Sequence, residues 1–309
     1  MDGALSREGL AARIRSGRPV LLDGALGTEL ERRSPDPRAT ALPLWSTHAL
    51  LGDASPIREI HRDYRRAGAE ILTANTFRTQ RRTLARAGLG DRADELTALA
   101  VALAREAATE LGTGDGAVDS RPVWVAGSAP PLEDCYHPER VPDHATLARE
   151  HAEHARALVC AGVDLILVET INTAREGVAA LRAAREAGAD ACISFVCDDA
   201  GRLLSGEPLA GALAAVAGLG PLAVLVNCLP PKHVAACLPA LRASGLAFGV
   251  YTNLGAPDDE IGFRRSDDSS PEDLAGFAAR WVSAGASIVG GCCGTEPGHI
   301  AAIAAALGR

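Results

Sequence analysis

Short apolar runs alternate with longer amphipathic stretches along nearly the whole chain. Eight runs are apolar throughout or almost so, as expected of parallel strands that are buried on both faces. They cover residues 19–22, 70–74, 123–126, 164–168, 191–196, 223–226, 246–250 and 287–289. The stretches between them are rich in Ala, Leu and Arg and predict helices at 56–67, 91–111, 144–161, 173–187, 208–218, 232–244, 271–284 and 297–307.

This repetition of strand and helix predicts an α/β protein with a single (β/α)8 TIM barrel over residues 1–309. A doubly wound open sheet is the alternative. Ser55 is the predicted N-cap of the helix that starts at Pro56. Two long irregular segments, 31–51 and 252–270, follow the first and seventh strands and are expected to cover the C-terminal mouth of the barrel, where such enzymes place their active sites.

Composition and charge narrow the classes of partner. Hydrophobic residues make up 47% of the 309 residues, which is enough for a large core. The net charge of −8 and the lack of a basic stretch argue against nucleic acid or an anionic membrane as a partner. The first 17 residues hold no apolar signal-peptide core, and no apolar run reaches about 18 residues, so we expect a cytoplasmic protein without a membrane span.

Three of the eight cysteines occupy special positions. Cys228 directly follows the sixth predicted strand, and Cys292 and Cys293 directly follow the eighth. Because the C-terminal ends of all barrel strands meet at one mouth, we expect these three thiols to lie close together. The other cysteines stand at positions 135, 160, 192, 197 and 237, and in a cytosolic chain all eight should stay reduced.

Three converging thiolates suit Zn²⁺, which prefers sulfur ligands and tetrahedral geometry. Three protein ligands rather than four are typical of a catalytic zinc, which keeps one position for water or substrate. A substrate thiol at that position would lose its proton at neutral pH. Cys228, Cys292 and Cys293 are therefore the predicted metal-binding and catalytic residues. Two alternatives are a redox-active pair formed by Cys292 and Cys293, and simple packing of buried thiols.

Five motifs, taken in order, resemble those of the zinc-dependent homocysteine S-methyltransferases. They are Asp-Gly-Ala-Leu-Gly-Thr-Glu-Leu at 23–30, Thr-Ala-Asn-Thr-Phe at 73–77, Glu169-Thr170, Val-Asn-Cys at 226–228 and Gly-Gly-Cys-Cys-Gly-Thr at 290–295. The likeness extends from about residue 19 to residue 303. It implies a (β/α)8 barrel, one zinc held by the three cysteines, and methyl transfer to homocysteine that forms methionine.

The same resemblance implies residues that bind homocysteine. Asp23 and Glu169 would face its ammonium group, and the backbone N–H groups of Gly24 and Ala25 would hold its carboxylate. Asp23 could instead cap a turn, and Glu169 could pair with Arg175. Further residues that could contact the substrate, or support the residues that do, are Asn75, Asn227, Tyr251, Asn253 and Trp45. An asparagine at a strand end can also be a turn residue, and Trp45 could be a packing residue.

The methyl donor is harder to predict. The betaine-using branch carries tyrosines where this chain has Arg78 and Thr170, and the sequence does not predict the aromatic cage that holds a quaternary ammonium. The cobalamin-dependent synthases need further domains, for which this chain has no room. The branch that uses S-methylmethionine or S-adenosylmethionine resembles the chain best, also through Leu44-Trp45-Ser46.

We therefore expect a zinc-dependent enzyme that moves a methyl group from a sulfonium donor to the zinc-bound thiolate of L-homocysteine. Alternatives are a betaine- or other-donor methyltransferase that acts on a thiol or selenol, a non-catalytic redox sensor, and a barrel lyase or isomerase without zinc. The sequence predicts no oligomeric state.

Overall fold

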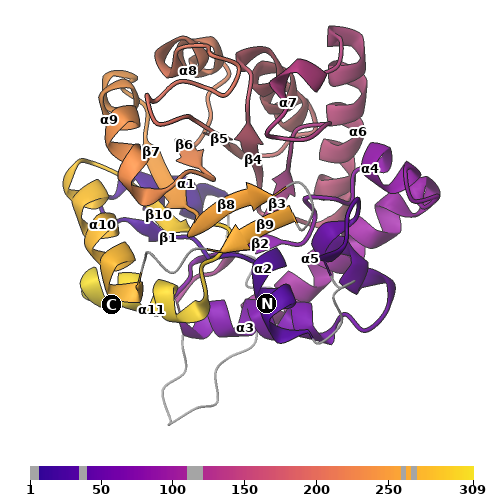
Figure 1. Cartoon of the computed structure of the whole chain (residues 1–309), viewed down its shortest axis with the longest axis horizontal. Helices are drawn as coiled ribbons and strands as arrows, with labels where there is room; N and C mark the ends of the chain where they lie inside the picture. Colours follow the sequence, from indigo (N-terminus) through magenta and orange to yellow (C-terminus); the bar gives the residue numbers. More distant parts are fainter. Residues whose placement is uncertain (1–6, 35–39, 110–120, 259–261, 266–269) are drawn as a thin grey trace.

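A computed structural model describes residues 7–34, 40–109, 121–258, 262–265 and 270–309. Eight parallel strands form one sheet in the order β1-β10-β7-β6-β5-β4-β3-β2. A parallel bridge between Leu22 and Ile71 joins the two ends of this order. The sheet is thus a barrel, which confirms the (β/α)8 prediction over the open sheet (Figure 1). The strands are β1 (Val20–Leu21), β2 (Ile71–Ala74), β3 (Trp124–Ala129), β4 (Leu165–Ile171), β5 (Ala191–Phe195), β6 (Val224–Asn227), β7 (Phe248–Thr252) and β10 (Ile288–Gly291).

Helices surround the barrel and connect its strands (Figure 1). All eight predicted helices are present, although the end of the stretch predicted at 91–111 lies outside the described residues. The predicted N-cap was wrong by one position, because the helix already begins at Ser55 and Ala54 is its N-cap. The helices are α3 (Ser55–Arg66), α5 (Ala93–Thr109), α6 (His144–Ala161), α7 (Ala174–Glu186), α8 (Leu209–Ala217), α9 (Val234–Ala243), α10 (Pro271–Ser283) and α11 (Pro297–Ala306).

Several elements were not predicted. The most important is α1 (Arg7–Arg15), because Leu10 and Ile14 on this helix are buried against residues of the barrel interior such as Val20 and Trp124. The segment predicted as an irregular loop at 252–270 contains an antiparallel hairpin, which crosses the centre of the barrel in the view of Figure 1. The remaining elements are α2 (Gly27–Arg33), α4 (Arg81–Ala85), β8 (Gly255–Asp258), β9 (Gly262–Arg265), η2 (Trp45–Leu51), η3 (Gly90–Arg92), η4 (Pro138–Arg140) and η5 (Pro231–His233).

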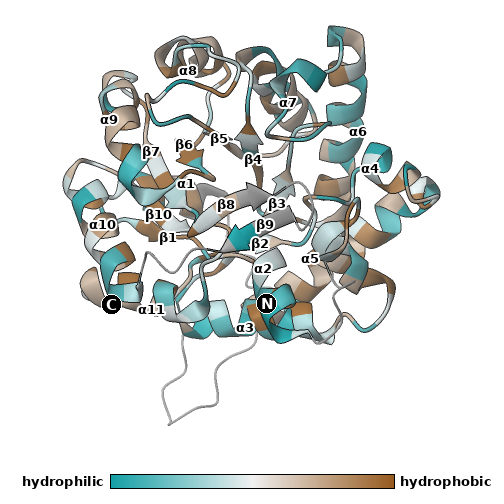
Figure 2. Cartoon of the chain, in the orientation of Figure 1, coloured by the Kyte–Doolittle hydropathy of each residue, from teal (hydrophilic) through white to brown (hydrophobic). Residues whose placement is uncertain are grey.

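The core has two layers. A large cluster packs the outer faces of the strands against the helices, and a smaller one fills the barrel interior. Figure 2 shows hydrophobic residues on the central strands and hydrophilic residues spread over the surrounding helices. Among the described residues, no helix is both long and apolar enough to cross a bilayer.

The alternation of side chains along each strand places polar groups at the C-terminal mouth. Leu165 and Leu167 on β4 belong to the apolar interior cluster, and Glu169, two residues further along, points the same way. On β3 the same period leads from Trp124 to Ser128. The lower part of the interior is therefore apolar, and its upper end carries the polar groups of the site.

Candidate active site

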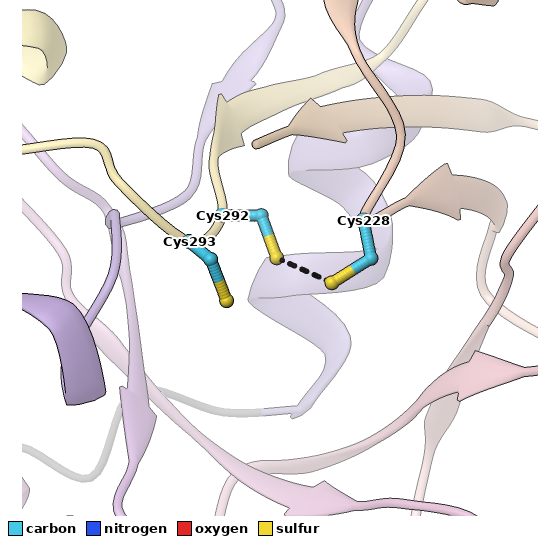
Figure 3. Close-up of side chains that lie close together, drawn as sticks. All are labelled: Cys228, Cys292 and Cys293. Carbon is cyan, nitrogen blue, oxygen red and sulfur yellow. Dashed lines mark hydrogen bonds between the residues drawn. The ribbon is translucent and has the colours of Figure 1, made fainter. Parts of the chain in front are cut away.

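The three cysteines singled out in the sequence lie together at the mouth of the barrel. The Sγ atoms of Cys228, Cys292 and Cys293 all lie within 4.8 Å of one another, and those of Cys228 and Cys292 are 3.1 Å apart (Figure 3). Three thiolates that share one zinc at about 2.3 Å would lie about 3.8 Å apart. The cluster can therefore hold one metal ion after small side-chain adjustments. All eight cysteines lie in the described part of the chain and are free thiols.

Hydrogen bonds between the three thiols lower the pKa of one of them, Cys228. The pKa of Cys228 is lowered well below its usual value, chiefly because the thiols of Cys292 and Cys293 donate hydrogen bonds to it. The hydroxyls of Tyr136 and Thr170 act in the same direction. The three thiols are thus linked by hydrogen bonds within one site.

The turn that carries Cys292 and Cys293 is held by short contacts. The Thr295 hydroxyl donates a hydrogen bond of 2.7 Å to the Cys292 carbonyl. A Cβ atom on Gly291 would collide with the Thr295 side chain, so this position requires glycine. The Cys292 N–H donates to the Thr252 carbonyl at 2.7 Å, which ties the turn to the end of β7.

Backbone strain is concentrated at the site. Among the described residues, the non-glycine residues with positive φ are Trp45, Thr170 and Cys228, at 49°, 59° and 55°. All three line the same pocket. L-residues adopt this conformation at a cost, and such strain is commonly found at functional sites.

The pocket above the cysteines has a volume of about 180 Å³. Its polar lining includes Asp23 and Glu169, and its aromatic lining consists of Trp45, Phe77, Tyr136 and Tyr251. A larger cavity of about 410 Å³ lies outside the barrel among α4, α5 and α6, and none of the cysteines lines it. The chemistry of the cysteines therefore belongs to the smaller pocket.

Two buried carboxylates face this pocket. Asp23 accepts hydrogen bonds from the backbone N–H of Thr73 at 2.7 Å and from its hydroxyl at 2.9 Å. Glu169 accepts hydrogen bonds from the hydroxyl of Ser128 and, at 3.0 Å, from the hydroxyl of Tyr251. Burial raises the pKa of Asp23 and that of Glu169 to about 7 in each case. A cation bound between them would restore their charged form.

These contacts bear on the alternatives considered for the two acids. Asp23 bonds to Thr73 on the neighbouring strand rather than capping its own turn. Arg175 does not pair with Glu169, because its guanidinium donates to the carbonyls of Val141 and Pro142. Both acids thus line the pocket, and their contact with the ammonium group of a substrate stays a prediction.

The three asparagines of the prediction have different positions. Asn75 lines the pocket, where its amide donates to the Ser46 carbonyl at 2.9 Å and its Oδ1 accepts from the Ser46 hydroxyl at 2.6 Å. Asn227 is fully buried behind Thr170 and bonds to its hydroxyl at 2.8 Å and to its N–H at 3.1 Å. Asn253 is buried outside the pocket lining, and its Oδ1 has no hydrogen-bond partner among the described residues. Of the three, only Asn75 is placed to touch a ligand.

Gly24 and Ala25 line the pocket between β1 and α2. The N–H of Ala25 donates to the Thr295 hydroxyl at 3.1 Å, so this donor already has a partner within the protein. The prediction that Ala25 holds a substrate carboxylate therefore requires this bond to be exchanged. Tyr64 supports the same loop, because its hydroxyl donates to the Ala25 carbonyl at 2.7 Å.

Several residues of the pocket were not predicted. Tyr136 lies in the loop after β3 and joins the other aromatic side chains of the pocket lining, a set that could not be assembled from the sequence. Its pKa is raised well above the usual value, mainly by burial and then by the nearby Cys228. Neither Tyr136 nor Cys135 belongs to a motif in the sequence. Only their place after a predicted strand could have indicated them.

Comparison with known proteins identifies the family. A family model described as homocysteine S-methyltransferase matches residues 20–307. The chain belongs to the homocysteine S-methyltransferase family. Family members that it resembles include the selenocysteine methyltransferase of Astragalus bisulcatus, which is 28% identical over 94% of this chain and 92% of that protein.

A methionine synthase of Mycobacterium tuberculosis is 32% identical over 95% of this chain, but the chain spans only 25% of the length of that relative. Among solved structures, the crystal structure of the homocysteine methyltransferase MmuM from Escherichia coli in its metallated form matches with a TM-score of 0.81 and 30% identity. That match covers 95% of this chain and 99% of MmuM. The chain thus has the fold of a methyltransferase family whose structural relative has a metallated form.

Proposed function

We propose that the protein transfers a methyl group from a sulfonium donor to the thiol of L-homocysteine and so forms methionine, with Zn²⁺ as its cofactor. The observation that carries this proposal is the convergence of three cysteine sulfurs within 4.8 Å at the floor of a pocket that also holds two buried carboxylates. The first group suits a metal that binds thiols, and the second suits the ammonium group of an amino acid.

Zinc fits the donor set best among the common metals. Cys228, Cys292 and Cys293 would hold it, since three soft thiolates select zinc over magnesium or calcium. Their number leaves one ligand position for substrate, as in catalytic zinc sites. When bound there, zinc would supply the Lewis acidity that keeps a substrate thiol ionised at neutral pH.

Homocysteine would bind with its thiol toward the cysteines and its ammonium group between Asp23 and Glu169. Tyr251 and Ser128 fix the Glu169 carboxylate, and Thr73 fixes that of Asp23. The carboxylate of the substrate would lie near Gly24 and Ala25, with a change in the bond between Ala25 and Thr295. We expect Glu169→Gln to raise the KM for homocysteine.

A sulfonium donor needs little further activation. The lone pair of the acceptor sulfur forms the new S–CH3 bond, and the electrons of the old S–CH3 bond return to the donor sulfur, which leaves as a neutral thioether. The protein has to align the two sulfurs and exclude water. The likeness of Leu44-Trp45-Ser46 to the branch that uses S-methylmethionine supports S-methylmethionine as the donor.

A second candidate uses the same site on another acceptor or donor. The likeness to a selenocysteine methyltransferase supports a selenol acceptor. The aromatic side chains of Trp45, Phe77, Tyr136 and Tyr251 would also suit the quaternary ammonium group of betaine.

A panel of donors and acceptors tests the proposal. Zinc-loaded protein would be incubated with homocysteine or selenocysteine and with S-methylmethionine, S-adenosylmethionine or betaine, and the methylated product would be quantified. We expect the highest rate for homocysteine with S-methylmethionine. A higher rate with selenocysteine or betaine would favour the second candidate, and no product from any pair would refute both.

A further inference from the structure

Arg78 is a cation of the pocket lining that has no ion-pair partner among the described residues. It lies in the loop between β2 and α4 and is half-buried. Its Nε is buried without a hydrogen-bond partner, and its guanidinium forms no ion pair with any described residue. Of the described residues that line the pocket, Arg78 alone is basic.

Two arginines that follow Arg78 in the sequence do form ion pairs with glutamates. Arg82 pairs with Glu150 and Glu133, and Arg86 pairs with Glu133. Glu133 and Glu150 are thus already paired with Arg82 and Arg86, whereas Arg78 has no ion pair among the described residues and lines the pocket. An unpaired guanidinium in a partly desolvated site is costly unless a ligand supplies the counter-charge.

The geometry of the guanidinium suits a carboxylate. Its Cζ atom lies 5.8 Å from the ring centroid of Phe77, which restricts the side chain on one face. Guanidinium groups bind planar anions through two parallel hydrogen bonds, and carboxylates are the usual partners in amino-acid ligands.

The charge of Arg78 acts on Cys135, another residue of the pocket lining. Burial raises the pKa of the Cys135 thiol, and the charge of Arg78 opposes that effect. Arg78 lies in the loop after β2, whereas Asp23 follows β1 and Glu169 lies on β4, so the guanidinium and the two carboxylates come from different segments of the pocket lining.

We propose that Arg78 binds the carboxylate of the methyl donor and thereby selects donors that carry both an onium centre and a carboxylate. This inference rests on the proposed methyltransferase function and specifies its second substrate. The onium group must point to the acceptor sulfur at the cysteines, and the carboxylate end then reaches Arg78. An onium compound without a carboxylate would meet the guanidinium as a like charge, so Arg78 acts against such donors as well as for the zwitterion.

The test compares S-methylmethionine with its methyl ester, which keeps the sulfonium and lacks the carboxylate charge. Arg78→Gln and Arg78→Lys would be assayed for the KM of each donor and for the KM of homocysteine, and binding of S-methylmethionine would be measured by calorimetry. Arg86→Gln is the matched control, because Arg86 pairs with Glu133 and is absent from the pocket lining.

We expect Arg78→Gln to raise both the KM and the dissociation constant for S-methylmethionine by about 10- to 100-fold, as for the loss of a charged hydrogen bond. The ester and homocysteine should keep their constants within about twofold, and Arg78→Lys should recover part of the loss. Equal losses for S-methylmethionine and its ester, or a rise confined to the KM of homocysteine, would overturn the proposal.

If the wild-type protein methylated no acceptor, the proposed function would fail. The calorimetric arm would still decide the role of Arg78. Weaker binding of S-methylmethionine to Arg78→Gln alone would support it, and unchanged binding would refute it.

Discussion

The indole ring of Trp45 occupies the space beside Gly27 that any side chain at residue 27 would have to fill. A Cβ atom built on Gly27 would collide with the indole nitrogen. Trp45 adopts a positive φ of 49° and lines the pocket, so the absence of a side chain at residue 27 allows the first turn of η2 to close over the site. Trp45 therefore packs against Gly27 and lines the pocket at the same time, and its contact with a substrate stays a prediction.

We predict that Gly27→Ala lowers kcat/KM by about tenfold while the barrel still folds, since alanine is favourable in the first turn of α2. Steady-state kinetics and circular dichroism would measure the two effects. The double variant with Trp45→Ala separates the cause. If the collision with Trp45 is responsible, Gly27→Ala should cost little in the Trp45→Ala background. Equal losses in both backgrounds would contradict this account.

Glu169 should make the stability of the substrate-free protein depend on pH. Burial raises its pKa from 4.5 to about 7, so the folded state binds more protons than the unfolded state between these values. The free energy of unfolding should therefore fall as the pH rises from about 4.5 to 7. Glu169→Gln removes this contribution, and we predict a higher melting temperature than wild type at pH 8, with a smaller gain at pH 5.

Thermal melts of the metal-free protein at the two pH values would measure this difference. Glu186→Gln is the control, because Glu186 is an exposed carboxyl at the end of α7 and should change neither melt. A Glu169→Gln variant that is less stable than wild type at pH 8 would show that the Ser128 and Tyr251 bonds outweigh the cost of burying the charge.

Asn227 holds Thr170, a residue of the pocket lining with positive φ, through two hydrogen bonds. Its side chain accepts hydrogen bonds from the Thr170 N–H and the Ser194 hydroxyl and donates to the Thr170 hydroxyl. We predict that Asn227→Ala lowers the free energy of unfolding by about 2–4 kcal/mol, since it leaves several buried polar groups unpaired. Ser194→Ala removes one of these bonds and should cost about 1 kcal/mol. Urea denaturation of both variants would test the ranking, and equal losses would be inconsistent with it.

The barrel could be predicted from the sequence because the same pattern of a short apolar run and a long amphipathic stretch occurs eight times. Each strand is a short apolar run and each following helix is long and amphipathic, so errors at one boundary left the count of eight unchanged. Elements without this pattern were missed. The helix α1 is largely polar, and among its residues whose burial is described Leu10 and Ile14 are the buried ones, because they pack against the barrel interior.

The site could be predicted where a residue directly follows a strand. The convergence of Cys228, Cys292 and Cys293 needed only the rule that barrel strands end at one mouth. Residues that reach the pocket from long loops, such as Tyr136, could not be placed, because their position depends on the path of the loop. The partner of the Ala25 N–H also could not be predicted, since Thr295 lies 270 positions away in the sequence.

The central claim is that the three clustered sulfurs bind one metal ion, and the zinc content of purified protein tests it most directly. We predict about one zinc per chain for the wild type, measured by mass spectrometry after dialysis, and a loss of most of it in Cys228→Ala, Cys292→Ser and Cys293→Ser. Cys135→Ser is the matched control, since this buried thiol lines the same pocket but lies outside the cluster, and it should keep its zinc. Full zinc content in the three cluster variants, or a wild type that binds none, would contradict the account.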